Sequence, residues 1–320
     1  MSRNFLVAPD SFKGTFDAAA VATAIAVGIE AAGGEADRCP VADGGEGTME
    51  VLLGTLGGER LSAQVHDPLR RPIEATFGLL GDGETAIVEV AQASGLPLLT
   101  PEERDPERAD TFGTGELIAA AVAAGAKRVL LAAGGSATTD GGRGAIEALR
   151  QTAPTSIEVL CDVRTPYEEA ARVFAPQKGA SPEAVERLAE KLDAFAAELP
   201  RDPRGLPMTG AAGGLSGGLW AYGATLRPGA DFVLDALDFD ARLARADAVI
   251  SGEGRFDSQS LEGKIVGAIA TRCAAGKPLH LIVGQNGLEE EAPIAISSLR
   301  AASSLKEIEA AGGELLRFQP

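Results

Sequence analysis

Four glycine-rich segments of the chain combine residue types that can bind or transfer a phosphate group. Each holds a carboxylate, and two also hold a lysine; they are residues 10–15, 43–47, 134–142 and 252–264. Glycine lets a backbone approach a ligand closely, and free N–H groups at a helix start attract phosphate or carboxylate. A carboxylate can hold Mg²⁺ or accept the proton of an attacking hydroxyl, and a lysine can neutralise phosphoryl charge. Together the four segments indicate phosphoryl transfer.

Each segment on its own could be a plain turn, with glycine for a positive φ and aspartate for capping. Lys178 and Lys264, taken singly, could likewise be solvated surface charges. Several of the segments follow predicted strands, however, and the carboxyl ends of parallel strands meet at one edge of a sheet. That shared position favours a binding site over a set of unrelated turns.

Two common nucleotide-binding motifs are absent. A Walker loop requires Ser or Thr after its Gly-Lys pair, whereas Gly263-Lys264 is followed by Ile265, and Ser258 stands where the first glycine belongs. The first predicted strand is not followed by the GxGxxG spacing of a dinucleotide-binding fold. A hydride-transfer enzyme is therefore less favoured.

The N-terminal part of the chain predicts two successive strand–loop–helix units. A strand at residues 5–8 leads through a loop into a helix over 17–32, and a strand near 39–41 leads into a helix over 49–56. Two such units in succession predict a parallel sheet. In open sheets of this kind ligands bind at the carboxyl ends of the strands, where the loops of both units lie.

The middle of the chain changes character. Residues 61–91 alternate between apolar and polar side chains and predict an antiparallel meander. Further strands are expected at residues 128–133, 157–163, 248–251 and 278–283, and helices at 114–124, 182–199, 215–222 and 263–275. We predict an α/β protein of two lobes. Residues 1–58 and 240–320 form a discontinuous Rossmann- or flavodoxin-like parallel-sheet lobe, and residues 59–239 form an inserted α/β lobe with the meander.

Composition narrows the classes of partner. The 320 residues carry a formal charge of −17, which repels the phosphate backbone of DNA or RNA and argues against a nucleic-acid partner. No apolar run approaches the roughly 18–20 residues that would cross a bilayer, so we expect no membrane partner. Three isolated cysteines indicate reduced thiols, and we expect a cytoplasmic protein. Two distant histidines make a zinc site improbable.

Eight blocks closely resemble the type-1 glycerate kinase family, in family order. They are APDSFKGT (8–15), PVADGGEGT (40–48), TFGTG (111–115), GGSATTDGG (134–142), PQKG (176–179), GAAGG (210–214), LRPGAD (226–231) and GEGRFD (252–257) with Gly263-Lys264. The resemblance implies a kinase that uses ATP and Mg²⁺ to convert glycerate to 2-phosphoglycerate. It also implies two lobes, with the active site in the cleft between them.

Within that resemblance we assign roles to the matching residues of this chain. The catalytic candidates are Lys13, Asp43 and Asp140, and the metal candidates are Glu253 and Asp257. The substrate-binding candidates are Asp10, Ser11, Gly44, Gly45, Glu46, Ser136, Asp162 and Lys178, and the cofactor-binding candidates are Gly252, Gly254 and Lys264. Either Asp43 or Asp140 accepts the hydroxyl proton.

The chain departs from the family pattern at Thr139 and Thr165, where asparagine is usual, and in the segment that follows Pro166. These departures bear on substrate preference more than on reaction type. Two alternatives therefore stay open: a kinase for another small hydroxy acid, and a non-catalytic sensor that binds glycerate. The oligomeric state also stays open.

Overall fold

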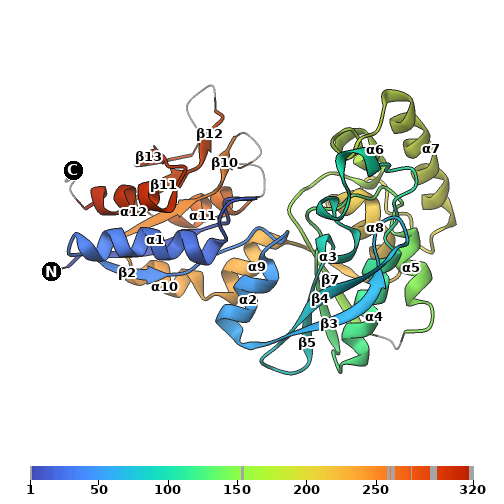
Figure 1. Cartoon of the computed structure of the whole chain (residues 1–320), viewed down its shortest axis with the longest axis horizontal. Helices are drawn as coiled ribbons and strands as arrows, with labels where there is room; N and C mark the ends of the chain where they lie inside the picture. The colour runs from blue at the N-terminus through green and yellow to red at the C-terminus, as the bar shows by residue number, and fades with distance from the viewer. Residues whose placement is uncertain are drawn as a thin grey trace. The chain divides into compact units, whose positions relative to one another are not determined.

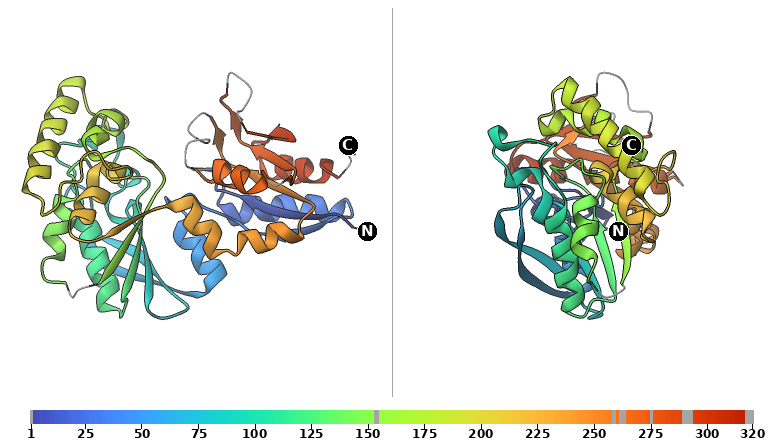
Figure 2. Two further views of the ribbon diagram at one scale, coloured as in Figure 1. Left: turned by 180° about the vertical axis from the view of Figure 1, so that it is seen from behind. Right: turned by 90° about the vertical axis from the view of Figure 1, so that its right-hand side faces the viewer.

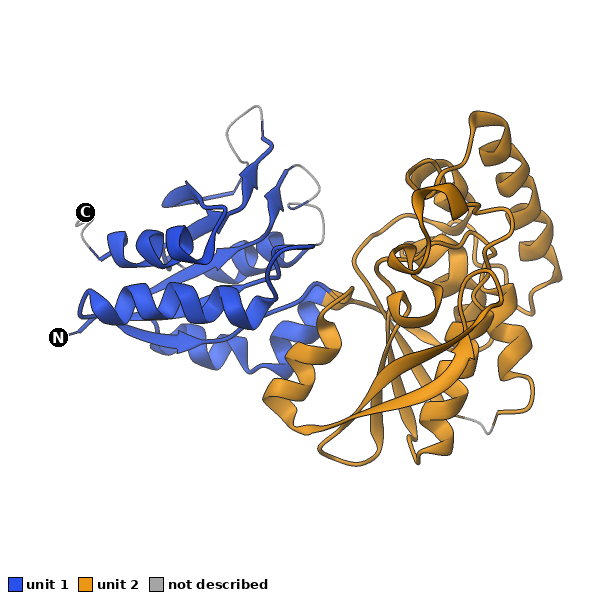
Figure 3. Cartoon of the chain, in the orientation of Figure 1, with its two compact units in different colours: residues 1–43, 230–320 blue, residues 44–229 orange. Residues whose placement is uncertain are grey.

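The computed structural model describes residues 2–152, 155–257, 260, 264–274, 276–288 and 294–316. The chain forms two compact units: unit 1 consists of residues 1–43 and 230–320, and unit 2 of residues 44–229 (Figure 3). Unit 1 contains a parallel sheet and unit 2 a mixed sheet, each with helices around it. The predicted α/β class is confirmed. None of the helices in the described ranges is long and apolar enough to span a membrane.

Unit 1 is built on five parallel strands. They are β1 (Asn4–Pro9), β2 (Glu35–Arg38), β9 (Ala248–Gly252), β11 (Leu279–Val283) and β13 (Ser298–Ala301), arranged in the order β13-β11-β9-β1-β2. The central strands β1, β9 and β11 are almost entirely buried, as expected where helices cover both faces of a parallel sheet. A two-stranded sheet of β10 (Arg255–Phe256) and β12 (Gln285–Asn286) extends the loops after β9 and β11.

Helices cover both faces of this sheet. They are α1 (Ala18–Ala31), α9 (Gly229–Ala236), α10 (Phe239–Arg245), α11 (Ile265–Cys273) and α12 (Leu305–Glu314). In Figure 1 α1 and α12 lie side by side toward the viewer, and the reverse view in Figure 2 brings α10 and α11 to the front. Helix α1 starts at Asp17, whose Oδ1 accepts the Ala20 N–H at 2.7 Å, and its apolar stripe is fully buried.

The order of the strands creates a crevice between two loops. Helix α1 carries the chain from β1 to β2, whereas α11 carries it from β9 to β11 in the opposite direction. Since β1 and β9 are neighbours, the loops that follow them diverge at the carboxyl edge of the sheet. Open α/β sheets bind ligands at such a switch point, and this strand order is the flavodoxin-like one.

Unit 2 is built on a six-stranded mixed sheet. Its strands follow chain order across the sheet: β3 (Gly58–His66), β4 (Pro72–Leu80), β5 (Thr85–Glu89), β6 (Arg128–Ala132), β7 (Ser156–Cys161) and β8 (Thr225–Pro228). β3, β4 and β5 pair antiparallel, with Ala63 opposite Ala75, and β5 to β8 run parallel. The predicted meander is confirmed.

Seven α-helices belong to the described part of unit 2. They are α2 (Thr48–Leu56), α3 (Ala91–Ser94), α4 (Phe112–Ala123), α5 (Arg143–Leu149), α6 (Ala170–Phe174), α7 (Pro182–Glu198) and α8 (Leu215–Ala221). Five short 3₁₀ helices join them: η1 (Leu96–Leu98), η2 (Pro101–Glu103), η3 (Tyr167–Glu169), η4 (Pro176–Lys178) and η5 (Ala211–Gly214). Helix α7 begins after Ser181, whose Oγ accepts the Ala184 N–H as the Ser-Pro sequence predicts.

Three details differ from the sequence prediction. The second strand lies at Glu35–Arg38 and not near 39–41. The sequence prediction missed it because an edge strand does not require an apolar run. The units divide after Asp43 and Gly229, whereas the prediction placed the divisions after residues 58 and 239. Helix α2 lies in unit 2 because it packs on β4 and β5. Residues 263 and 275, the predicted ends of α11, lie outside the described residues.

Candidate active site

A cavity of about 440 Å³ lies at the carboxyl edge of the parallel sheet of unit 1. Its walls come from the loops after β1 and β9, from Asp43, and from residues that follow β11 and β13. Eight predicted site residues line it: Asp10, Ser11, Lys13, Asp43, Glu253, Gly254, Asp257 and Lys264. The structure thus brings together the first, second and fourth of the glycine-rich segments at one edge.

Close backbone packing holds the two main loops of this cavity. The Asp10 N–H donates to the carbonyl of Gly252 at 2.8 Å, which joins the end of β1 to the end of β9. A Cβ atom on Gly252 would lie 1.9 Å from the Ile282 carbonyl oxygen, and one on Gly254 would lie 3.2 Å from the Lys13 nitrogen. Gly252 therefore needs glycine for packing between strands, and a side chain at Gly254 would be tight against the neighbouring loop; both reasons are independent of any nucleotide.

Two aspartates and a lysine meet inside the cavity. Asp10 and Asp43 are 5% and 2% exposed, and Lys13 Nζ lies 3.9 Å from Asp43 Oδ2. Burial raises the pKa of Asp10 to about 8, and the negative charge of Asp43 adds to this effect. Lys13 and the Ser11 N–H, which donates to Asp10 Oδ1 at 2.6 Å, act in the opposite direction. At neutral pH, Asp10 therefore carries a proton beside the Asp43 carboxylate.

Glu253 presents a carboxylate oxygen that lacks a partner. Its Oε1 atom is buried and has no hydrogen-bond partner among the described residues. Burial raises the pKa of Glu253 to about 7, against the opposing effects of the Ser260 hydroxyl and Lys264. Lys264 stands immediately before α11, at its N-cap. A buried acceptor of this kind, next to a second carboxylate at Asp257, is suited to a cation.

The donor set of the cavity fits Mg²⁺ in one specific way. Among the described residues no three His, Cys, Asp or Glu side chains are grouped so that they could hold a metal ion. Mg²⁺ prefers oxygen ligands and is commonly bound by one or two carboxylates together with water and substrate phosphates. Glu253 and Asp257 match that pattern. They do not match an all-protein metal cage.

Six residues that line the cavity were missing from the sequence prediction: Phe12, Thr15, Arg255, Gly284, Gln285 and Ser303. Arg255 lies 3.4 Å from Asp257 through its Nε, while Gln285 and Ser303 follow β11 and β13. Arg255 lies in the GEGRFD sequence at 252–257, where its positive charge is the signal that marks it as a candidate. Ser303 precedes the capping sequence Ser304-x-x-Glu307, which is readable from the sequence and marks the start of α12.

A smaller cavity of about 210 Å³ lies in unit 2. Ser136, Asp162 and Lys178 line it, together with backbone of the loops at Gly134–Gly135 and Ala212–Gly213. Lys178 is 3% exposed, and its Nζ donates to the Thr138 carbonyl at 2.5 Å. The Ser136 hydroxyl accepts the Thr138 N–H at 3.1 Å and lies 2.8 Å from Thr138 Oγ1. Three predicted substrate-binding residues therefore share a second cavity.

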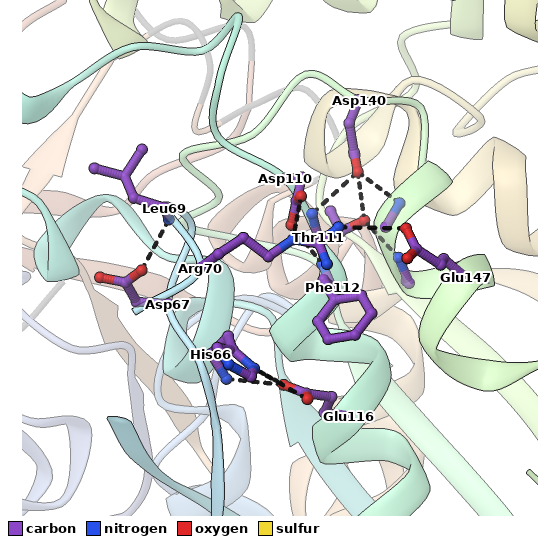
Figure 4. A network of polar contacts seen from close by, with 12 residues as sticks. His66, Asp67, Leu69, Arg70, Asp110, Thr111, Phe112, Glu116, Asp140 and Glu147 are labelled. Atoms are coloured by element: carbon purple, nitrogen blue, oxygen red, sulfur yellow. Dashed lines mark hydrogen bonds and ion pairs between the residues drawn. The ribbon is translucent and has the colours of Figure 1, made fainter. Parts of the chain in front are cut away.

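Asp140 is not among the residues that line either cavity. Figure 4 shows its carboxylate at the centre of a network: Oδ2 accepts the N–H and hydroxyl of Thr111 at 3.0 and 2.7 Å and the Gly144 N–H at 3.0 Å, and Oδ1 accepts the Gly142 N–H at 3.0 Å. Desolvation raises the pKa of Asp140 against these donors. The carboxylate joins the starts of α4 and α5. This geometry favours a structural role over that of a proton acceptor.

The same network extends to the surface of unit 2. Arg70 donates to Asp110 at 2.6 Å and stacks its guanidinium 3.9 Å from the ring centre of Phe112, the first residue of α4 (Figure 4). His66 Nδ1 lies 2.9 Å from Glu116 Oε2 on the same helix. These contacts fix α4 and, through Thr111 and Asp140, the glycine-rich loop that precedes α5.

The loop before α2 packs by its glycines. A Cβ atom on Gly44 would lie 2.6 Å from Gly229 Cα, and one on Gly134 would lie 2.6 Å from Gly45 Cα. Glu46 is exposed and lines neither cavity. The sequence prediction missed Glu89, a buried carboxylate that accepts the Met49 N–H at 2.9 Å at the start of α2. In the sequence, the one feature that could have identified Glu89 is its position at the end of the strand β5.

Comparison with known proteins places these features in a family. A family model described as "Glycerate kinase family" matches residues 5–156 and 150–317. The glycerate kinase of Haemophilus influenzae is 40% identical over 322 residues, with 88% of this chain and 85% of that protein covered. The glycerate 2-kinase of Escherichia coli is 37% identical over 321 residues, with 87% and 84% covered.

A solved structure is similar over the whole length. It comes from Salmonella typhimurium LT2 and is provisionally named glycerate kinase 2. It shares 34% sequence identity with a TM-score of 0.82, and 99% of this chain and 98% of that chain are covered. The sequence and fold relationships therefore agree.

Proposed function

The chain belongs to the glycerate kinase family, and we propose that it transfers the terminal phosphoryl group of ATP to the 2-hydroxyl of D-glycerate. Membership makes it a phosphotransferase that acts on an alcohol group. The observation that carries the proposal is the cavity of unit 1, where two lysines and four carboxyl groups line the carboxyl edge of a parallel sheet. Phosphoryl transfer needs this combination of cations, metal ligands and a proton acceptor.

We assign the phosphoryl donor to unit 1. A volume of about 440 Å³ lies within the range of about 300–1,000 Å³ that is typical of ligand pockets. Lys13 and Lys264 supply positive charge for the phosphates in a chain that has no Walker loop. The switch point between β1 and β9 is the expected position for a nucleotide in this topology.

Glu253 and Asp257 would hold Mg²⁺, with water and the nucleotide phosphates as its other ligands. When bound, Mg²⁺ neutralises charge that develops on the transferred group. The unpartnered Oε1 atom of Glu253 supports this assignment, because a buried acceptor without a donor is costly unless a cation or a donor occupies its other side.

We propose Asp43 as the proton acceptor. As the hydroxyl oxygen forms its bond to phosphorus, the bond from phosphorus to the leaving oxygen of ADP breaks, and the hydroxyl proton passes to the Asp43 carboxylate. Asp43 lines the cavity beside Lys13, whereas all four contacts of Asp140 are to its own scaffold. Asp10 and Ser11 would bind the donor or the acceptor at the same edge.

We assign the hydroxy acid to unit 2, through Ser136, Asp162 and Lys178. Gly44 and Gly45 would support the adjoining loop without contacting the substrate. Two alternatives were predicted from the sequence: a kinase for another small hydroxy acid and a non-catalytic sensor. An assay of ADP formation distinguishes both from the proposal.

The test is ADP formation from ATP and Mg²⁺ with D-glycerate, L-glycerate and tartronate as separate acceptors. Phosphorus NMR of the product then distinguishes phosphate on the 2-hydroxyl from phosphate on the 3-hydroxyl. We expect turnover with D-glycerate and 2-phosphoglycerate as the product. Turnover with another acid alone would correct the substrate, a 3-phosphate would correct the position, and binding without ADP formation would establish a sensor.

A further inference from the structure

Lys178 is buried with spare hydrogen-bonding capacity. It is 3% exposed, and in the described part of the chain its ammonium donates to one acceptor, the Thr138 carbonyl. An ammonium has three donors, so two N–H groups lack a protein acceptor at this site. Leaving charged donors without partners in a desolvated position costs free energy, and proteins seldom retain such a group unless something else pairs with it.

Lys178, whose ammonium is incompletely hydrogen-bonded, lines the 210 Å³ cavity of unit 2. The Ser136 hydroxyl lines the same cavity, and because its oxygen already accepts the Thr138 N–H, its proton is available either to Thr138 Oγ1 or to a ligand. The volume falls below the range of about 300–1,000 Å³ for pockets that hold drug-sized ligands. The cavity therefore suits an anion with only a few heavy atoms.

We propose that this cavity is the carboxylate subsite for the hydroxy acid, in which Lys178 pairs with the carboxylate and Ser136 donates a hydrogen bond to it. Asp162, which also lines the cavity, would accept the hydrogen bond of a substrate hydroxyl. The inference rests on the proposed function and deepens it by assigning an atom-level partner to the acid group. It separates Lys178 from the lysines that face the phosphates.

The protonation state of Lys178 depends on whether a carboxylate is bound in the cavity. Burial lowers the pKa of Lys178 to about 7, and the charge of Asp140 acts against this effect. Asp162 is the other charged group at the cavity. A bound carboxylate favours the charged ammonium and raises its pKa, so above pH 7 binding of the acid takes up a proton. Binding of a neutral analogue takes up none.

The first test compares Lys178→Met with Lys191→Met. Lys191 lies on α7 of the same unit, is 59% exposed, and pairs with Glu107, so its replacement makes the same charge change at the surface. Calorimetric titration should show Lys178→Met weakening D-glycerate binding about 10–100-fold, as expected for a lost charge-assisted hydrogen bond. Glyceramide, in which a neutral amide replaces the carboxylate, should lose less affinity than the acid in Lys178→Met, because only the acid loses a charge–charge interaction. The KM for ATP should change less than threefold.

Two further measurements remain informative if Lys178→Met is unstable. Wild-type protein titrated with D-glycerate in two buffers of different ionisation enthalpy should take up more protons at pH 8 than at pH 6. Ser136→Ala should weaken D-glycerate binding about 3–10-fold and weaken glyceramide binding less, because a hydrogen bond to an ionised carboxylate is stronger than one to a neutral amide. Unchanged D-glycerate affinity in the variants, equal losses for acid and amide, or the absence of proton uptake would overturn the subsite.

The outcome can be separated from that of the proposed function. If the wild-type enzyme transfers no phosphate to any hydroxy acid but binds D-glycerate through Lys178, the kinase proposal fails and the subsite stands. If it turns over D-glycerate while Lys178→Met binds the acid normally, the kinase proposal stands and the subsite fails.

Discussion

The two units of this protein use similar glycine-rich loops to build cavities in which the buried groups with shifted pKa values are of opposite kinds, acidic in unit 1 and basic in unit 2. In unit 1, the buried carboxylates Asp10 and Glu253 have raised pKa values of about 8 and 7. In unit 2, the buried Lys178 has a lowered pKa of about 7. In all three groups burial disfavours the charged form, and each charge becomes favourable only when a ligand of opposite sign is near.

This difference indicates that the two cavities bind different partners, a cation in unit 1 and an anion in unit 2. A buried carboxylate oxygen without a hydrogen-bond partner among the described residues, as in Glu253, favours a cation, and a nucleotide can bring Mg²⁺ to it. A small cavity with an incompletely bonded ammonium calls for an anion. Glycine-rich loops at strand ends thus provide space for a ligand but do not determine which ligand binds. The buried side chains beneath each opening decide which partner binds, and the following predictions test that view.

The largest effect is expected for Asp43→Asn. Loss of the proton acceptor should lower kcat about 10²–10⁴-fold while Mg²⁺–ATP still binds. Steady-state kinetics and a nucleotide titration measure the two quantities. Asp240→Asn, whose carboxylate is 71% exposed on α10 of the same unit, is the matched control. A kcat within threefold of the wild-type value would remove Asp43 from catalysis.

Asp140→Asn should act through stability and not through chemistry. Three donors reach Oδ2 and one reaches Oδ1, so an amide in either orientation sets its NH₂ group against an N–H donor. We expect a loss of about 2–3 kcal/mol in the free energy of unfolding, measured by urea denaturation. Asp193→Asn on the exposed face of α7 is the control. A fully stable Asp140→Asn enzyme without turnover would restore Asp140 as the base.

Glu253→Gln should reduce activity in a way that added metal repairs. The variant keeps the shape of the side chain but loses the negative charge, so the Mg²⁺ concentration at half-maximal rate should rise about 10–100-fold, with kcat largely recovered at saturating Mg²⁺. Turnover measured across a Mg²⁺ titration gives both values. Failure of Mg²⁺ to restore the rate would show that Glu253 serves the reaction in another way.

Much of the fold could be predicted because its main elements carry strong local patterns. The apolar run of β1, the stripe of α1 and the Ser-Pro start of α7 each specify their element. β2 could not be located by its composition, since an edge strand of sequence Glu-Ala-Asp-Arg has little to bury. Residues 39–41, of which Cys39 and Val41 are buried, suggested a strand but belong to the loop that follows β2.

The sequence predicted which loops form the candidate site, but it did not predict the role of each residue in them. The sequence places Asp10, Asp43 and Glu253 after strands, and parallel topology brings them together. It does not show that Asp140 is saturated by donors from two helices, or that Lys178 is buried with one acceptor. Those properties depend on contacts between segments 29 to 40 residues apart, which no local pattern specifies.

A pH titration should separate the buried acid of unit 1 from its neighbours. The pKa of Asp10 is raised from 3.8 to about 8, so between these values the folded protein holds a proton that the unfolded chain has lost. The metal-free protein should therefore lose stability as pH rises from about 4 to 8. Asp10→Asn should reduce this slope by up to about 1.4 kcal/mol per pH unit, measured by denaturation at several pH values. An unchanged slope would mean that Asp10 is ionised in the folded protein.

The smallest effect concerns a second polar atom without a partner. Like Glu253 Oε1, the hydroxyl of Tyr167 is buried and has no hydrogen-bond partner among the described residues. Tyr167 differs in that it lines neither cavity; its hydroxyl lies against Gly141, where a Cβ atom would stand 2.1 Å away. If an unpartnered atom marks a ligand only where a cavity adjoins it, the Tyr167 hydroxyl serves no ligand.

Tyr167→Phe should therefore leave kcat and KM unchanged and leave the free energy of unfolding equal or higher by up to about 1 kcal/mol, because an unsatisfied buried hydroxyl is removed while the ring and its packing remain. Urea denaturation measures the change. Tyr222→Phe, at a tyrosine that is 61% exposed, is the control for the loss of a hydroxyl in water. A loss of more than 1 kcal/mol in Tyr167→Phe alone would show that a bound water or ligand pairs with this hydroxyl. In that case Glu253 of unit 1 and Tyr167 of unit 2 could no longer be distinguished by whether a cavity adjoins them. An adjoining cavity would then not be a valid criterion for a ligand-binding atom.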